Sequence, residues 1–478
     1  MSKYHLRKSL FAGVAALALL GAVAGCSDDD DGKVASGQSS TTSATTAGGS
    51  DGEGNVLKVP GDHVTIQEAV DAASEGDLIL VSEGTYNEAV DVTTPDITIR
   101  GVDRNKVILD GEFELENGIR VLDTDGVVVE NMTARNYVSN GFYWTGSDRY
   151  RGSYLTAYRN GDYGIYAFDA YHGQLDNSYG SGSPDAGFYI GECFECDAVI
   201  DNVISEYNGL GYSGTNSGGE LYIVNSTFRN NRAGIVPNSG SYELCYPGRS
   251  NTIVGNLIHD NNYLEGPGID VSLLAQGNGI LLAGSINNIV ERNRVYDHDR
   301  TGIAAVPFPE EDASDSPPEA SELDRPCEET RDDEIPDEPI GLVLWNATGN
   351  RIVENVIEGS GLADIASATI ALEEGAATTA ELDNCFADNT HTSSSPTDLE
   401  ALAPCEGEGN GGDFEAGALD ITVLMLEQPD KPEKDLYKTT PVPDDQPNMP
   451  DAETAPAKRF EGPTKPDIAA ITVPDKPA

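Results

Sequence analysis

The sequence predicts an all-β chain that folds as a single long solenoid, on three observations. Glycine followed by a large apolar residue recurs every 23 residues, at Gly118, Gly141, Gly164 and Gly187. Apolar alternation in segments such as 253–258 is typical of strands. The 52 glycines, with little Leu or Met at helical spacing, favour a turn-rich β protein over a helical one. A period near 23 with short strands indicates about three strands per turn.

Residues 1–25 predict an export signal. A basic head precedes an apolar run over 10–20 that is too short and too early to span a membrane. The run ends in small residues before Cys26, which resembles a bacterial lipoprotein signal whose cysteine becomes lipidated. An ordinary secretory signal with an incidental cysteine is the alternative. We therefore expect an exported protein, lipid-anchored to the outer face of a bacterial membrane, with residues 26–54 as a flexible Ser/Thr/Gly/Asp tether.

A short helix is predicted at the entry of the solenoid. Thr65 and Glu68 form a capping-box pattern, and Ile66, Ala69 and Val70 follow at helical spacing. Such a helix would cover the open N-terminal end, where strand edges are otherwise exposed.

The repeat continues to about residue 375, with glycine-apolar pairs also at Gly234, Gly279, Gly302 and Gly341. A second column consists of asparagines, which tolerate left-handed turns and can hydrogen-bond their equivalents one turn away. Its members are Asn131, Asn177, Asn202, Asn225, Asn256, Asn293 and Asn355. Residues 55–375 thus resemble the right-handed parallel β-helix of the pectin-lyase-like superfamily. The resemblance implies the fold, and it implies a polysaccharide lyase, epimerase or hydrolase if the protein is an enzyme.

Two insertions interrupt the repeat, at about 240–270 and 307–338. The second is acidic, with 14 carboxylates against Arg325 and Arg331 between Glu310 and Glu338, which makes calcium the one candidate cofactor. Residues 376–428 are predicted to cap the C-terminal end. Residues 429–478 contain 11 prolines and form an acidic tail without a core of its own, which either wraps the solenoid or hangs free.

Six cysteines remain after Cys26, and an even number in an exported protein indicates disulfides. Six cysteines allow 15 pairings, so the spacing alone does not choose among them. We expect Cys193–Cys196, Cys245–Cys327, with one cysteine from each insertion, and Cys385–Cys405. A redox motif or half of a zinc site at Cys193 and Cys196 is the alternative.

The period also predicts which side chains stack, because residues 23 apart become neighbours across a parallel ladder. Four apolar residues should face inward: Ile119, Phe142, Ile165 and Phe188. The residues that follow them should face outward: Arg120, Tyr143, Tyr166 and Tyr189. Two further columns are Arg149, His172 and Glu195, and the acidic Asp123, Asp169 and Glu192. Residues 137–194 also hold 15 of the 33 aromatic side chains.

Outward tyrosines beside charged groups are typical of a surface that binds sugars, because rings stack on sugar faces and charges hold hydroxyls or uronates. The predicted binding residues are Tyr143, Tyr166, Tyr189, Arg120, Glu192 and Glu195. If the face is catalytic, His172 or Arg149 would act as base near Asp169. The alternative is that the tyrosines pack under the first insertion or the tail and only stabilise the solenoid.

The catalytic signatures of the resembling families are incomplete. The paired Gln and Asp motifs of pectin methylesterases and the calcium carboxylates and arginine of pectate lyases are not found. Tyr171-His172-Gly173 is a fragment of the polygalacturonase pattern, and Asp297-His298-Asp299 is a partial echo of the mannuronan epimerase element, with an ordinary polar turn as its alternative. No metal site can be assigned.

The formal charge of −52 argues against a nucleic-acid partner, since phosphate neutralisation needs Lys and Arg. Two function classes remain. One is a cell-surface lipoprotein that binds a polysaccharide, with or without modifying it. The other is a non-catalytic structural protein whose outer face docks an envelope protein.

Overall fold

The computed structural model describes residues 54–323, 325–330, 339–368, 382–407, 419 and 421–477. The predicted export signal, Cys26 and nearly all of the tether lie outside these residues. So do residues 324 and 331–338 of the acidic insertion and much of the predicted capping region. In the described part, helices are too short or too polar to cross a bilayer.

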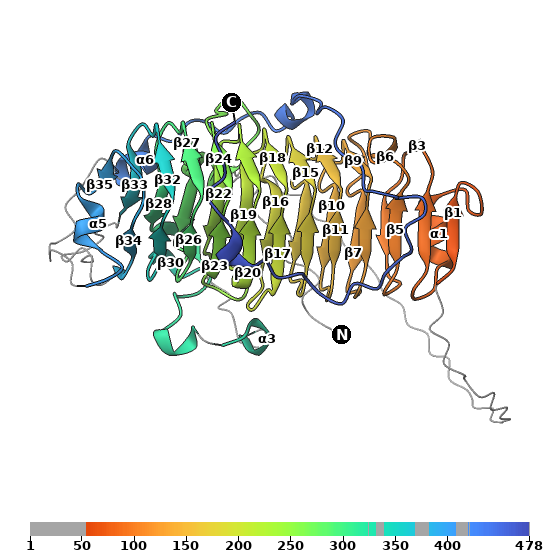
Figure 1. Ribbon diagram of the computed structural model, residues 1–478, viewed down its shortest axis with the longest axis horizontal. Helices are drawn as coiled ribbons and strands as arrows, with labels where there is room; N and C mark the ends of the chain where they lie inside the picture. Colours follow the sequence, from red (N-terminus) through yellow and green to blue (C-terminus); the bar gives the residue numbers. More distant parts are fainter. Residues whose placement is uncertain are drawn as a thin grey trace, which may run out of the picture. The chain divides into compact units, whose positions relative to one another are not determined.

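Three long parallel sheets wind around one axis (Figure 1), and we call them sheets A, B and C. Sheet A is β1 (Val56–Val59), β2 (Leu78–Val81), β5 (Thr98–Gly101), β8 (Val128–Glu130), β11 (Arg151–Ser153), β14 (Gln174–Asp176), β17 (Ala198–Asp201), β20 (Gly218–Val224), β23 (Arg249–Val254), β26 (Ile289–Glu291), β31 (Arg351–Val353) and β34 (Cys385–Ala387). Sheet B is β3 (Gly84–Tyr86), β6 (Val107–Asp110), β9 (Thr133–Arg135), β12 (Thr156–Tyr158), β15 (Tyr179–Ser181), β18 (Ile204–Glu206), β21 (Thr227–Arg229), β24 (Leu257–His259), β27 (Arg294–Tyr296) and β32 (Val356–Glu358). Sheet C is β4 (Val90–Val92), β7 (Ile119–Leu122), β10 (Phe142–Thr145), β13 (Ile165–Phe168), β16 (Ala186–Gly191), β19 (Leu210–Thr215), β22 (Ala233–Asn238), β25 (Ile280–Ala283), β28 (Thr301–Val306), β33 (Ala363–Ser367) and β35 (Ser394–Ser395).

The fold is a right-handed parallel β-helix, as predicted, with one strand of each sheet per turn. The inward column is in register, since Phe142 pairs with Ile119 and Ile165, and Ile165 pairs with Phe188. All four side chains are buried in one continuous core. The turn between Gly187 and Gly234 is supplied by β19, in which Tyr212 occupies the same column.

The N-terminal end is covered by helix α1 (Ile66–Ala72), as predicted. The Thr65 hydroxyl accepts a hydrogen bond from the Glu68 N–H at 3.1 Å, and the Glu68 carboxylate accepts one from the Val64 N–H at 3.0 Å. The helix buries Ile66, Ala69 and Val70 against the first strands.

The asparagines predicted as one column belong to two adjacent columns. Asn131, Asn177, Asn202 and Asn225 occupy left-handed turn positions with φ between 50° and 57°. The others form an internal ladder, in which Asn256 donates to Asn293 and Asn293 to Asn355, each at 3.0 Å. The two positions follow one another in the chain. Up to Asn225 these asparagines occupy the left-handed position of each turn, and from Asn256 onward they occupy the buried position that comes next.

The sequence also placed Gly341 and Leu342 in the coil, and this is wrong. They belong to β30 (Gly341–Trp345), which pairs antiparallel with β29 (Phe308–Ala313) as a hairpin of the second insertion. The sheet C strand that follows β28 is β33, in which Ile365 pairs with Ile303. The coil also extends past residue 375, since β34 and β35 complete sheets A and C and α5 (Leu399–Leu402) lies beside β33 and β34.

The insertions cover the C-terminal half of the outer face of sheet C. The extra residues of the first insertion form two turns, at 239–248 and 260–279, the second of which contains α2 (Asp270–Ala275). Together with the hairpin they bury a second apolar cluster that includes Val236, Ala304 and Trp345. Short helical turns η1 (Ala320–Glu322) and α3 (Cys327–Thr330) follow in the second insertion.

All three expected disulfides are present, and they indicate an exported protein. Cys193–Cys196 closes a turn, Cys245–Cys327 joins the two insertions, and Cys385–Cys405 ties the C-terminal end. Because Cys193 and Cys196 are bonded to each other, they are not half of a zinc site. Their complete burial leaves neither sulfur open to thiol exchange, which argues against a redox motif.

The proline-rich tail lies along the coil (dark blue in Figure 1) after helix α6 (Ile421–Leu426). Its partners show that it first runs toward the N-terminal end of the coil and then doubles back. Thr440 lies at Arg159, Gln446 at Asn105, Ala455 at Arg100, Thr464 at Gln174, Ile471 at Arg292 and Pro474 at Arg294. It contains two short 3₁₀ turns, η2 (Leu436–Thr439) and η3 (Ile468–Ala470).

Arginines of the coil hold the tail mainly by its backbone carbonyls. Arg159 donates to the Thr440 carbonyl at 2.8 Å and Arg292 to the Ile471 carbonyl at 2.9 Å. A proline-rich segment has few N–H groups and exposes its carbonyls, and guanidinium groups supply the donors that they need. The most buried of these arginines is Arg104, whose pKa burial lowers to about 9.

Candidate functional site

The predicted outward column exists on the N-terminal half of sheet C. Arg120 pairs with Tyr143, Tyr143 with Tyr166, and Tyr166 with Tyr189, on strands β7, β10, β13 and β16. The Tyr143 and Tyr166 ring centroids are 5.0 Å apart, and those of Tyr166 and Tyr189 are 4.7 Å apart. We call these four residues, with Asp91 on β4 before them, the tyrosine face.

The rings do not all face solvent. Tyr189 is only 1% exposed, because the turn at 239–248 covers it and Glu243 accepts a hydrogen bond from its hydroxyl at 2.6 Å. Tyr166 is enclosed by Tyr143, Tyr189 and Tyr163, whose ring centroid lies 4.4 Å away. Tyr143 is the last ring of the stack and is followed by Arg120. Tyr189 is therefore closed to a sugar, contrary to the prediction. Tyr143 and Tyr166 are both partly exposed, and Tyr143, at the end of the stack, has one ring face that is not stacked on another tyrosine.

Two rows of carboxyl groups flank the tyrosine face. One lies in the turns before sheet C, where backbone hydrogen bonds link Glu116, Ser139, Asp162 and Asp185 from turn to turn. The other lies in the turns after sheet C, at Asp123, Gly146, Asp169 and Glu192, all with positive φ. The second row is the acidic column that the sequence predicts, including its interruption at glycine.

The carboxyl groups nearest the buried end of the stack have raised pKa values. Burial raises the pKa of Asp162 to about 6 and that of Asp185 to about 8, the latter also through the charge of Asp162 one turn away. Burial, together with the charge of Glu192, raises the pKa of Glu243 well above its ordinary value. Asp185 and Glu243 therefore hold their protons at neutral pH, which suits carboxyl groups beneath packed rings, whereas Asp162 is mostly ionised there.

A hollow of about 290 Å³ opens at the other end of the face. It is lined by Ala89, Asp91, Glu114, Leu115, Glu116, Asn117 and Arg120. The Arg120 guanidinium donates two hydrogen bonds to Asp91, at 2.9 Å and 3.0 Å. Arg120 connects this hollow to the Tyr143 ring, its neighbour in the sheet.

The three catalytic candidates are not assembled around one reacting position. His172 and Arg149 meet at Asp148, with Nδ1 of His172 2.5 Å and Nε of Arg149 3.7 Å from its carboxylate oxygens. Arg149 also pairs with Asp96 at 3.0 Å. Asp169 instead accepts a hydrogen bond from Tyr171 at 3.3 Å. His172 and Arg149 therefore belong to the turn that leads into sheet A.

Glu195 does not stack on His172, contrary to the 23-residue count. His172 donates its backbone N–H to the Cys196 carbonyl, and Gly173 donates to Asp197, because the turn closed by Cys193–Cys196 contains two extra residues. Asp197 occupies the predicted position instead, with its carboxylate 3.8 Å from Nε2 of His172. Asp197 is also paired with Lys465 of the tail at 3.0 Å.

The Asp297-His298-Asp299 element is structural. His298 is buried and its Nε2 lies 3.1 Å from the side-chain nitrogen of Asn261. Burial lowers the pKa of His298 to about 3, so the ring stays neutral in the core. The ordinary-turn alternative is therefore the better interpretation.

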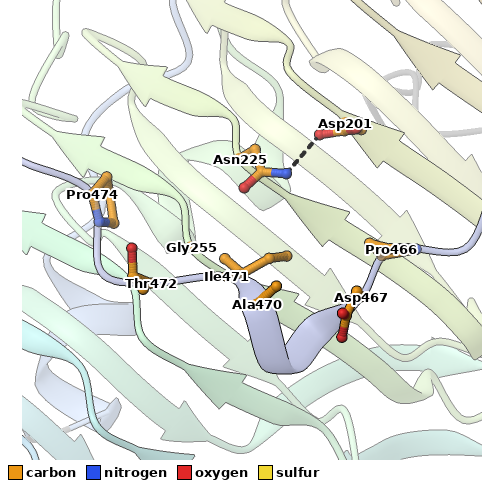
Figure 2. Close-up of a pocket in the computed structure, with 9 residues that line it drawn as sticks. All are labelled: Asp201, Asn225, Gly255, Pro466, Asp467, Ala470, Ile471, Thr472 and Pro474. Carbon is orange, nitrogen blue, oxygen red and sulfur yellow. Dashed lines mark hydrogen bonds between the residues drawn. The ribbon is translucent and has the colours of Figure 1, made fainter.

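A second hollow, of about 600 Å³, lies where the tail crosses the turns between sheets A and B. Figure 2 shows Asp201 and Asn225 on the coil, joined by a hydrogen bond of 2.9 Å, opposite Pro466, Ala470 and Ile471 of the tail. The coil side is polar and the tail side is mostly apolar.

Several residues that surround the tyrosine face were not predicted. Asp162 and Asp185 could have been found, because they follow Glu116 at two and three periods of 23. Tyr163 directly follows Asp162, so the same 23-residue spacing predicts its position as well. Glu243 and Tyr242 come from an insertion, and no periodic signal points to where an insertion folds back.

A family model described as periplasmic copper-binding protein (NosD) matches residues 70–268. No curated protein matches the chain. Among solved structures, the A-module of mannuronan C-5 epimerase AlgE4 from Azotobacter vinelandii is 14% identical, with a TM-score of 0.41, covering 71% of this chain and 92% of that chain. The alginate lyase from Paenibacillus sp. str. FPU-7 is 14% identical, with a TM-score of 0.38, covering 71% and 99%. Pectate lyase Pel9A is 13% identical, with a TM-score of 0.38, covering 69% and 72%.

The register of the three parallel sheets, the cap helix and the 23-residue period establish the architecture independently. The chain is therefore a right-handed parallel β-helix repeat protein in which residues 70–268 are similar to the NosD family model.

Proposed function

We propose that the tyrosine face binds a polysaccharide at its Tyr143 end. The observation that carries this proposal is the continuity of an aromatic ring, an arginine and a hollow along one outer strand column. A sugar ring would stack on Tyr143, while Arg120, Asp91 and Asn117 hydrogen-bond its hydroxyls. The insertions cover the rest of sheet C, so a bound chain would end against them or turn aside.

Binding is a better-supported role than modification. A base and an acid that act on one sugar must reach the same bond. Here His172 and Arg149 converge on Asp148 at the edge next to sheet A, whereas the hollow lies at the edge next to sheet B. We therefore assign no catalytic residue.

Two variants test this proposal. Tyr143→Ala should abolish glycan-array binding while lowering the free energy of unfolding by about 2 kcal/mol, because the ring is only partly exposed and packs on Tyr166. Tyr189→Phe is the matched control, since it changes a buried ring of the same stack without removing it. It should keep the binding of the wild type. Unchanged binding by Tyr143→Ala would contradict the proposed site.

A structural role is the second candidate, and the burial of Tyr189 and the enclosure of Tyr166 favour it. In that case the stack only stabilises the coil, as cross-strand aromatic pairs do. No glycan would bind the wild type, and Tyr189→Ala would still cost about 3 kcal/mol or more by opening a cavity. The docked partner would be an envelope protein.

We propose that the exported chain is anchored through lipidated Cys26. The support is the sequence before Cys26 and the tether that separates it from the coil. A Cys26→Ser variant should move the protein from the membrane fraction to the soluble fraction. Equal distribution of both forms would contradict the anchor.

The residues do not fit a copper site of the kind that the matching family's name suggests. Copper favours His, Cys and Met ligands. Within 70–268 the described cysteines are disulfide-bonded, Met132 is buried in the core, and His172 and His259 pair separately with Asp148 and Asp260. Across the described residues, no three His, Cys, Asp or Glu side chains are grouped to hold a metal.

Calcium in the acidic insertion stays a prediction. In its described part, Glu310 accepts hydrogen bonds from Ser241 and Trp345, and Asp315 accepts one from Tyr246. A bound ion would stabilise the folded state, so chelation would lower the melting temperature. A melting temperature that does not respond to chelator would contradict it.

A further inference from the structure

We infer that the polysaccharide bound at the tyrosine face is uncharged, and not a polyuronate. The inference rests on the proposed function and adds the class of ligand. It is drawn from the distribution of charge and of hydrogen-bond acceptors around the Tyr143 ring.

The hollow beside Tyr143 has a negative lining. Asp91, Glu114 and Glu116 are exposed carboxylates, and Arg120 is the one basic residue among its lining residues. The Arg120 charge is already compensated, because both of its bonding nitrogens are held by the two carboxylate oxygens of Asp91. A uronate entering the hollow would therefore meet a net negative charge.

The same sign continues along the ladder. Glu116 and Asp162 belong to one flanking row, and Asp123 and Asp169 to the other. The nearest arginine on that second edge, Arg149, is paired with Asp96. A chain with a charge on every sugar would lie between Glu116 and Asp162 on one side and Asp123 and Asp169 on the other, which all carry the same sign of charge as the chain.

Hydrogen-bond chemistry leads to the same class. An ionised carboxylate only accepts hydrogen bonds, so Glu114 and Glu116 need donors from the ligand. The hydroxyls of a neutral sugar supply those donors. A uronate carboxylate also has only acceptor oxygens, so it could not hydrogen-bond to the carboxylates of Glu114 and Glu116.

The test uses two oligosaccharides with the same backbone, one with ionised carboxylates and one with the same carboxyl groups methyl-esterified. Oligogalacturonate and its fully methyl-esterified form share a backbone, and both are titrated against the full-length protein at low salt. We expect the esterified form to bind at least tenfold more tightly, and we expect added NaCl to narrow the difference. Equal or tighter binding of the acid form would overturn this inference while leaving the proposed function intact.

Two double variants test whether the preference for the uncharged chain arises in the hollow. Glu114→Gln combined with Glu116→Gln removes two charges from the hollow and should narrow the ratio of the two affinities several-fold. Glu265→Gln combined with Glu311→Gln removes two exposed charges elsewhere and should leave that ratio unchanged. If neither galacturonate form and no neutral glycan of an array binds the wild type, the proposed function itself is wrong, and this inference fails with it.

Discussion

At the scale of single residues, the stack of tyrosines depends on carboxyl groups that keep their protons. Asp185 is 8% exposed, it lies one turn from Asp162, and Tyr163 hydrogen-bonds to it. Two ionised carboxylates in this position would repel each other without enough water to screen them. The packing of the buried rings is therefore linked to pH.

The sign of this pH dependence follows from the direction of the shifts. The folded protein holds protons on this pair up to about pH 6 and pH 8, whereas the unfolded chain releases them near pH 4. The folded state thus binds more protons over this range, and stability falls as pH rises from about 4 to 8. Below about pH 4 both the folded and the unfolded state hold these protons, so the pair no longer lowers the free energy of unfolding.

Asp185→Asn should flatten this dependence, because the amide keeps the shape of the neutral acid. We expect a gain on the order of 1–3 kcal/mol at pH 8 relative to the wild type, and almost none at pH 4. Asp123→Asn, at an exposed position of the other row, is the matched control and should leave the slope unchanged. Denaturant unfolding at both pH values measures the effect, and an equal gain at pH 4 and pH 8 would contradict the explanation.

At the scale of elements, the tail is a strap that the coil recognises by its backbone. One close approach is at Gly255, where φ is +69° and a Cβ atom would lie 2.2 Å from Cγ2 of Ile471. Glycine is required there both by the left-handed backbone and by the tail. The tail and the turn between sheets A and B are therefore complementary in shape.

Gly255→Ala should release the returning arm of the tail. Gly76→Ala is the matched control, because Gly76 also has positive φ but an added Cβ would meet no atom within 4 Å. Both variants carry the backbone cost of about 1 kcal/mol, and only Gly255→Ala displaces Ile471. Thermolysin, which cleaves before large apolar residues, should then cut the Ala470–Ile471 bond several-fold faster in Gly255→Ala than in Gly76→Ala. Equal cleavage rates would show that the tail is not held at this point.

The sequence alone was informative where the chain is periodic. The 23-residue spacing located the inward column and the tyrosine column, because parallel ladders convert spacing directly into contact. The cap helix was located by its capping box at Thr65 and Glu68. It failed at Glu195, where two extra residues in one turn shift the register, and at Gly341, where a hairpin imitates the glycine-apolar pair. The covering of Tyr189 by Glu243 was also out of reach, since an insertion has no register to count from.

At the scale of the whole molecule, a formal charge of −52 is spread over the coil, insertions and tail. Such an excess keeps a protein soluble but destabilises its compact state by self-repulsion. The tail is held largely by arginine–carbonyl hydrogen bonds, which salt weakens less than ion pairs. Screening should therefore stabilise the fold overall.

We expect the melting temperature to rise by several degrees as NaCl is increased from about 20 mM to about 200 mM. Choline chloride at equal ionic strength should give the same rise, because screening needs no specific cation. A fall in melting temperature with salt would mean that the ion pairs of the tail outweigh the repulsion.

The central claim is that a sugar ring stacks on Tyr143 at the open end of the tyrosine face. A crystal structure with an oligosaccharide selected on a glycan array tests it most directly. We predict a sugar ring parallel to the Tyr143 ring, with its hydroxyls on Arg120, Glu114 or Glu116. An oligosaccharide found instead in the hollow between the tail and Asn225, with the Tyr143 ring uncovered, would contradict this account.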